Sequence, residues 1–178
     1  MIELPARHGQ LLDAYYASQG DSNDCGPHAV AMTVNYWHGE ARLDASTLAR
    51  EMNRPRFQRG FPPIVIRRVP GWATFPWGMV DALRQNGVAA RWRFMASEDV
   101  LRRAISEGRP VLPVFGEPLR RDGWRFAGWG HVAVLVGWDE VRLWFVDSSH
   151  PGPRFARPRE DFLRQWRNLG RLVVEVLA

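Results

Sequence analysis

The chain has 178 residues and 46% hydrophobic residues, enough for one domain with its own apolar core. No apolar run approaches the roughly 18 residues that a membrane span requires. The net charge of +5 comes from 24 basic and 19 acidic residues, and every basic residue is arginine. These arginines are scattered along the chain, which indicates a solvated basic surface and no nucleic-acid partner. The lack of lysine excludes a Schiff-base or lysine-nucleophile mechanism.

Cys25 is the only cysteine, so the chain forms no internal disulfide, as is usual in a reducing compartment. Residues 1–5 lack the basic and apolar regions of a signal peptide. A cytoplasmic location is therefore the default expectation, with export by another route left open. Composition leaves the oligomeric state undetermined.

The first half of the chain reads mainly as helices. A short helix is expected within 11–16, a longer one over 25–38, a third ending near 52 with Ser46 as its cap, and a fourth over 76–85. Residues 53–73 are rich in Arg, Pro and Gly. They predict a long surface loop, either a substrate lid or a plain connection.

The second half reads mainly as strands. The expected strands span 88–94, 110–115, 131–136, 141–146 and 171–177, the expected helices span 98–107 and 160–167, and a Gly- and Trp-containing loop spans 116–130. Helices before strands predict an α+β fold, with an N-terminal helical half packed on a C-terminal antiparallel sheet. No repeat or linker divides residues 1–178.

Cys25 follows four good helix-capping residues, so it is expected at a helix N-terminus, where the backbone dipole favours a thiolate. A thiol nucleophile needs a base, and the base needs an orienting group. His131 opens an otherwise apolar strand, and Asp147 directly follows the next one. A capping or packing role is the alternative for His131. His28 lies near Cys25, but a metal site there lacks further closely spaced ligands.

The register of the hairpin between these strands decides whether His131 and Asp147 meet. A two-residue loop at Asp139 and Glu140 would turn them to opposite faces of the sheet. A three-residue loop pairs Gly137 with Val141 and sets His131 directly opposite Asp147. The catalytic hypothesis therefore predicts an odd-length loop or a bulge, with Asp139 or Glu140 in a left-handed conformation.

The predicted mechanism gives one role to each of four residues. Cys25 attacks as the thiolate, His131 acts as base and then acid, and Asp147 holds the imidazole in place. Gln19 reaches back toward the sulfur and completes an oxyanion hole with the Cys25 N–H. Taken alone, Gln19 reads more readily as a turn residue bonded to the backbone.

These residues resemble a known family. Gln19 six residues before Cys25-Gly26-Pro27, the Gly130-His131 strand, and Asp147 sixteen residues after His131 are similar to the stand-alone, C39-like bacterial cysteine peptidases. The resemblance covers roughly 15–170. It implies a papain-like fold with the site between its halves, and a thiol peptidase that needs no metal or cofactor. Ser148 departs from the pattern, because the family usually has proline after the aspartate.

The leading hypothesis is hydrolysis of a peptide or protein substrate. The alternatives are acyl transfer by the same residues, as in a transglutaminase-like enzyme or an effector, and a non-catalytic peptide-binding module. Four tryptophans are candidates for the walls of the groove, although core or rim packing is the commoner role of such residues. They are Trp72, Trp77, Trp124 and Trp129.

Overall fold

The computed structural model describes residues 1–122 and 125–177. Its helices are η1 (Leu12–Tyr15, 3-10), α1 (Cys25–His38), α2 (Ala45–Met52), α3 (Pro76–Gln85), α4 (Glu98–Ser106) and α5 (Arg159–Asn168). The predicted helices are therefore confirmed to within one or two residues at each end. No helix among these residues is both long and apolar enough to cross a bilayer.

The main sheet is antiparallel, with the order β11-β10-β9-β7-β12-β6; β1 pairs with β9, and β8 pairs with β7. Its strands are β1 (Ile2–Glu3), β6 (Ala90–Arg93), β7 (Val111–Asp122), β8 (Arg125–Val132), β9 (Val134–Trp138), β10 (Arg142–Val146), β11 (Phe155–Pro158) and β12 (Val173–Val176). The helices precede most of the antiparallel sheet in the chain, as the sequence predicted for an α+β fold. The sequence analysis missed β11.

Helix α1 lies at the centre of the helical half because nearly all of its surface is apolar or small. Every residue from Cys25 to Tyr36 is buried. A helix that is apolar all round is stable only when other elements surround it. It contacts α2, α3, η1 and β8, so this helix joins the helical half to the sheet.

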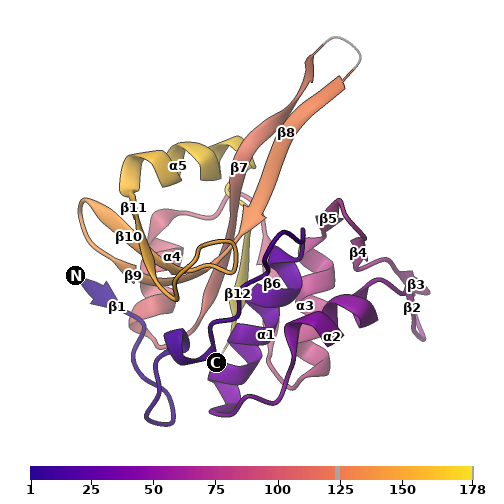
Figure 1. Ribbon diagram of the computed structural model, residues 1–178, viewed down its shortest axis with the longest axis horizontal. Coiled ribbons are helices and arrows are strands. Elements are labelled where there is room, and N and C mark those ends of the chain that lie inside the picture. Colours follow the sequence, from indigo (N-terminus) through magenta and orange to yellow (C-terminus); the bar gives the residue numbers. More distant parts are fainter. Residues whose placement is uncertain (123–124, 178) are drawn as a thin grey trace.

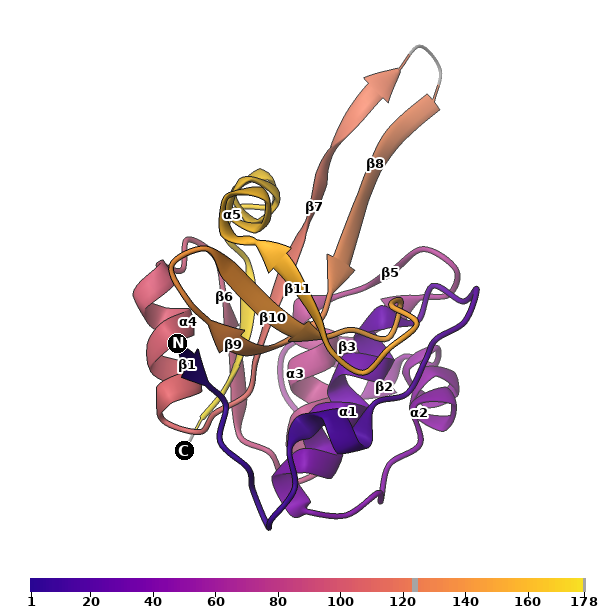
Figure 2. The ribbon, with the colours of Figure 1, turned by 60° about the vertical axis from the view of Figure 1, so that its left-hand side comes forward.

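The helices lie on both sides of the sheet. Figure 2 shows α1, α2 and α3 grouped on one side and α4 on the other. Helix α5 packs on β7, β10 and β11 and completes the core of the sheet half. Phe162 of α5 is fully buried there, with ring centroids 5.7 Å from Phe115 and 5.3 Å from Phe145.

The expected loop over 116–130 is wrong. Strands β7 and β8 occupy its described residues, 116–122 and 125–130, and form a long hairpin that projects from the rest of the molecule (Figure 1). Gly116, which suggests a loop in the sequence, instead allows a close approach of two backbones. A Cβ at Gly116 would lie 2.0 Å from the Trp129 carbonyl oxygen.

Two smaller features also correct the sequence analysis. The segment 53–73 holds two short ribbons, β2 (Arg56–Phe57) with β3 (Ile64–Val65) and β4 (Arg68–Val69) with β5 (Ala73–Thr74). Asp44, not Ser46, caps α2, because its carboxylate accepts a 2.7 Å hydrogen bond from the Thr47 N–H. Ser46 instead donates to Asp44 at 2.6 Å.

A β-bulge sets the register between β9 and β10. Trp144 pairs with Gly137, but the next residue, Phe145, pairs with Leu135, so Val136 is the extra residue. Continuing this register places Asp147 opposite Ala133, on the same face as His131. The predicted bulge is thus confirmed, whereas the predicted pairing of Gly137 with Val141 is wrong.

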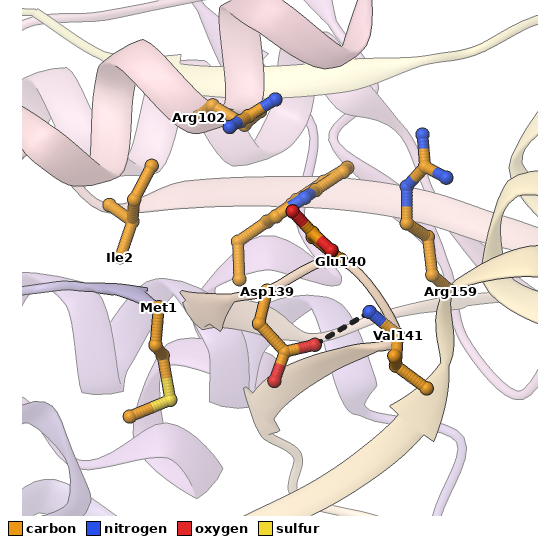
Figure 3. Close-up of a pocket in the computed structure, with 8 residues that line it drawn as sticks. Met1, Ile2, Arg102, Asp139, Glu140, Val141 and Arg159 are labelled. Carbon is orange, nitrogen blue, oxygen red and sulfur yellow. Dashed lines mark hydrogen bonds between the residues drawn. The ribbon is translucent and has the colours of Figure 1, made fainter.

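The turn of this hairpin also differs from the prediction. Neither Asp139 nor Glu140 is among the described residues with positive φ. The Asp139 carboxylate instead accepts 2.7 Å hydrogen bonds from the N–H groups of Val141 and Arg142, and Figure 3 shows the first of them. A side-chain acceptor therefore stabilises the turn, and no left-handed residue is needed.

Replacing Phe162 with alanine removes a fully buried ring from the centre of the sheet half. We expect the free energy of unfolding to fall by about 3–5 kcal/mol, as measured by urea denaturation. Arg164→Ala on the exposed face of α5 is the matched control, with an expected loss below about 1 kcal/mol. Equal losses in the two variants would show that Phe162 is not a core residue.

Candidate active site

Cys25 is the first residue of α1, at the boundary between the helices and the sheet. The first intrahelical hydrogen bond runs from the His28 N–H to the Asp24 carbonyl. The N–H groups of Cys25 and Gly26 precede that bond and are therefore available to an anion. Pro27 has no N–H, which costs nothing in this first turn.

His131 and Asp147 are in direct polar contact. The Nε2 of His131 lies 2.7 Å and 2.8 Å from the two carboxylate oxygens of Asp147. Ser149 fixes the same carboxylate, because its N–H and its hydroxyl each donate to Oδ1 at 2.8 Å. The other ring nitrogen, Nδ1, takes no part in this contact.

The electrostatics favour a protonated imidazole. Burial of His131 opposes its protonation, but hydrogen bonding and charge from Asp147 and Cys25 raise its pKa to about 9. Burial alone would raise the pKa of Asp147, which is 3% exposed, but the interaction with His131 lowers it. The pair is therefore ionised near neutral pH.

Cys25 and His131 line one cleft of about 440 Å³ between the two halves of the fold. Trp72 and Trp129 also line this cleft, as the sequence analysis suggested. Trp77 does not; its indole N–H donates to the Ile66 carbonyl at 2.8 Å. Trp124 lies outside the described residues. A larger cavity of about 610 Å³ lies at the β9–β10 turn (Figure 3) and contains none of the predicted site residues.

Gln19 is held beside the sheet by Ser148. The Gln19 N–H donates to the Ser148 carbonyl at 2.9 Å, and the Ser148 hydroxyl donates to Gln19 Oε1 at 2.7 Å. The Gln19 side-chain nitrogen donates to the Ser22 carbonyl at 2.7 Å, which occupies one of its two hydrogens. This contact matches the turn-residue role that the sequence also allowed, and Gln19 is not among the residues that line the cleft with Cys25. Ser148, where the family usually has proline, thus fixes the orientation of Gln19.

A buried ion pair lies under the start of α1. The Arg68 guanidinium, only 2% exposed, donates to the Asp24 carboxylate at 2.5 Å. Asp24 directly precedes Cys25, so an unpaired charge there would disfavour a neighbouring thiolate. Sequence reasoning assigned neither residue this role, because Arg68 is one arginine among many and 44 positions separate the partners.

Thr74 fixes the same helix start from β5. A Cβ at Gly26 would lie 2.5 Å from the Thr74 Cβ, so only glycine fits between Cys25 and Pro27. His28 does not join the site. Its Nδ1 lies 3.0 Å from the Ala17 carbonyl oxygen, an interaction that holds the segment before α1.

A sequence profile of the Peptidase_C39 like family matches residues 11–174. The chain belongs to this family. No curated protein gave a match. Membership agrees with the resemblance drawn from the Cys25, His131 and Asp147 motifs.

Solved structures of this family share the fold. A candidate C39-like peptidase from Bacillus anthracis superposes with a TM-score of 0.67 at 17% identity, covering 92% of this chain and 94% of that one. The peptidase domain of Streptococcus ComA, a bifunctional ABC transporter, gives a TM-score of 0.57 at 15% identity, with 92% and 98% coverage. The double-glycine-motif protease of an AMS/PCAT transporter, solved with the leader peptide, gives a TM-score of 0.57 at 14% identity. The match covers 92% of this chain and 91% of that one. The fold is therefore the papain-like fold of C39 peptidase domains.

Replacing Asp147 with asparagine removes the charge that raises the pKa of His131. We expect the pKa of His131 to fall from about 9 toward 6.5 in the variant, as measured by NMR titration of the imidazole ring.

The same linkage predicts the pH dependence of stability. Because folding raises the pKa of His131, the protonated imidazole stabilises the folded state fully below the unfolded pKa of 6.5. This stabilisation is lost as the pH rises through about 9. The Asp147→Asn variant should lack most of this decline. Identical titration curves for the two proteins would contradict the ion pair.

Proposed function

We propose that the chain is a thiol peptidase that hydrolyses a peptide bond through Cys25, His131 and Asp147. The observation that carries the proposal is the position of His131, whose Nε2 interacts with the Asp147 carboxylate and which lines the same cleft as Cys25. Hydrogen bonding and charge from Cys25 also contribute to the raised pKa of His131. This arrangement supplies a nucleophile and a base in one cleft, with an orienting carboxylate bonded to the base.

The first half-reaction forms an acyl-enzyme. The Cys25 thiolate attacks the substrate carbonyl carbon, and the carbonyl oxygen becomes an oxyanion. The Cys25 N–H and the second hydrogen of the Gln19 amide donate to it. The imidazolium of His131 then gives its proton to the leaving amine, and the C–N bond breaks.

The second half-reaction releases the acid. His131, now neutral, takes a proton from water as the oxygen attacks the thioester carbon. Collapse of this intermediate breaks the C–S bond and restores the Cys25 thiolate and the His131 imidazolium. Asp147 remains ionised throughout and holds the ring orientation. The chemistry requires no metal or cofactor.

A peptide substrate is supported by the family and by a structural neighbour. That neighbour, a double-glycine-motif protease, is in complex with a leader peptide. The cleft of this chain is open and has the apolar and aromatic walls that suit a peptide strand. Acyl transfer is the second candidate, because the same acyl-enzyme precedes both reactions and only the acceptor differs.

A peptide-library cleavage profile tests the proposal, with Cys25→Ala as the control. We expect the wild-type chain to cleave a subset of peptides and Cys25→Ala to cleave none. Cys25 should also react with iodoacetamide at pH 6–7 faster than free cysteine, and His131→Ala should remove that excess.

Cleavage that survives in Cys25→Ala would overturn the proposal, as would a Cys25 that reacts no faster than free cysteine. Amine incorporation that exceeds hydrolysis of the same donor peptide would favour acyl transfer. Peptide binding with no cleavage would favour the non-catalytic module.

Gln19→Ala tests the oxyanion hole. We expect kcat to fall by about 10²–10³-fold with little change in KM, because the donor acts mainly in the transition state. Ser148→Ala is the matched variant; it keeps the backbone contact to Gln19 but loses the contact to Oε1. Its loss in kcat should be smaller. An unchanged kcat in Gln19→Ala would leave Gln19 as a turn residue.

A further inference from the structure

A second pocket of about 430 Å³ lies on the other side of His131. It shares Asn23, Trp129, Gly130 and His131 with the cleft, but Cys25 does not line it. Asp147 is among its lining residues. The two cavities therefore meet at the imidazole, one on the thiol side and one on the carboxylate side.

The proposed mechanism, on which this inference rests, assigns a direction to the substrate. The acyl part stays on the Cys25 sulfur, whereas the leaving amine receives its proton from His131 and so lies next to the imidazole. The peptide that continues from that amine leads away from Cys25 and past His131. The second pocket is the cavity in that direction.

Arg157 of β11 gives this pocket its charge. Its guanidinium carbon lies 4.8 Å from the centroid of the Phe115 ring, which also lines the pocket. The nearby carboxylates have other partners, because Asp147 binds His131 and Asp161 pairs with Arg164 at 3.1 Å. Within the described part of the chain, no carboxylate lies within ion-pair distance of Arg157.

The guanidinium is only partly solvated. Burial lowers the pKa of Arg157, opposed by the charges of Asp147 and Asp161. Arginine nonetheless stays protonated at any physiological pH. A half-buried guanidinium that has no carboxylate partner is stabilised by a bound anion, because the anion replaces hydrogen bonds that burial has removed.

His150 adds a second polar group to the pocket. Its ring stacks on Phe155 at 4.6 Å between centroids, and its Nδ1 accepts from the Gly152 N–H at 3.3 Å. A neutral ring in this arrangement carries its proton on Nε2, which is then a donor. The pocket thus combines donors with aromatic walls.

We propose that this second pocket binds the leaving-group side of the substrate and that Arg157 selects a carboxylate there. The carboxylate is either an acidic side chain just after the scissile bond or the C-terminal carboxylate of a short leaving peptide. Arg157 is a specificity-determining residue, because it contacts substrate and takes no part in the bond-breaking steps.

Three tripeptides that mimic the leaving product test the proposal: Glu-Ala-Ala-amide, Gln-Ala-Ala-amide and Gln-Ala-Ala with a free carboxylate. Their dissociation constants are measured by NMR titration of the Cys25→Ala protein, so the readout does not depend on turnover. We expect at least one carboxylate peptide to bind about tenfold more tightly than the uncharged peptide. The peptide that does so identifies which carboxylate is selected.

Arg157→Gln in the same background should abolish the preference, whereas Arg142→Gln should retain it. Arg142 is exposed on the neighbouring strand β10, lines neither cavity, and its replacement changes the net charge equally. Arg157→Lys keeps the charge without the planar fork and should show a reduced preference. In the unmodified pocket, raising salt from roughly 0.05 M to 0.5 M should weaken the preference.

Equal binding of the three peptides, no detectable binding of any, or a preference that survives Arg157→Gln would overturn the proposal. The library profile separates this result from the fate of the proposed function. If the chain cleaves peptides but shows no carboxylate preference, the proposed peptidase function stands and only the proposed role of Arg157 is wrong.

Discussion

The contact between His131 and Asp147 depends on the face of the sheet to which each side chain points. His131 lies near the end of β8, which leads into β9, and Asp147 directly follows β10, the partner of β9. The turn between β9 and β10, at Glu140 and Val141, would by itself direct the two side chains to opposite faces. The extra residue at Val136 reverses the alternation before the site is reached. One inserted residue in β9 therefore decides whether the imidazole has a carboxylate partner, which is a common use of bulges beside active sites.

The other half of the site depends on how the start of α1 is held. Cys25 begins a helix that is buried on all sides, so its position follows from core packing. Arg68 neutralises the carboxylate of Asp24 beside the sulfur, and Thr74 packs directly on Gly26. Arg68 lies in the segment over 53–73, which the sequence suggested only as a surface loop or lid, and Thr74 directly follows this segment. This segment thus forms one wall of the cleft and the support of the nucleophile.

The sequence predicted those features that local rules decide. Capping residues, Pro27 and the spacing of apolar residues identified α1 and α3 with their observed ends, and one polar residue at the end of an apolar strand identified His131 and Asp147. The missed features depend on distant partners. Gly116 suggested a loop, but it lies where two strands approach closely. Arg68, Ser148 and Ser149 have roles only through residues that the fold brings to them, and no local pattern encodes such partners.

The central claim is that Cys25, His131 and Asp147, from three separate elements, act as one unit. A double-mutant cycle on peptide cleavage tests this most directly, with kcat/KM measured for His131→Ala, Asp147→Ala and the double variant. The account predicts that the double variant is no slower than His131→Ala, because Asp147 has no role once the imidazole is gone. A double variant slowed by the product of the two single effects would contradict it, since the two residues would then act independently.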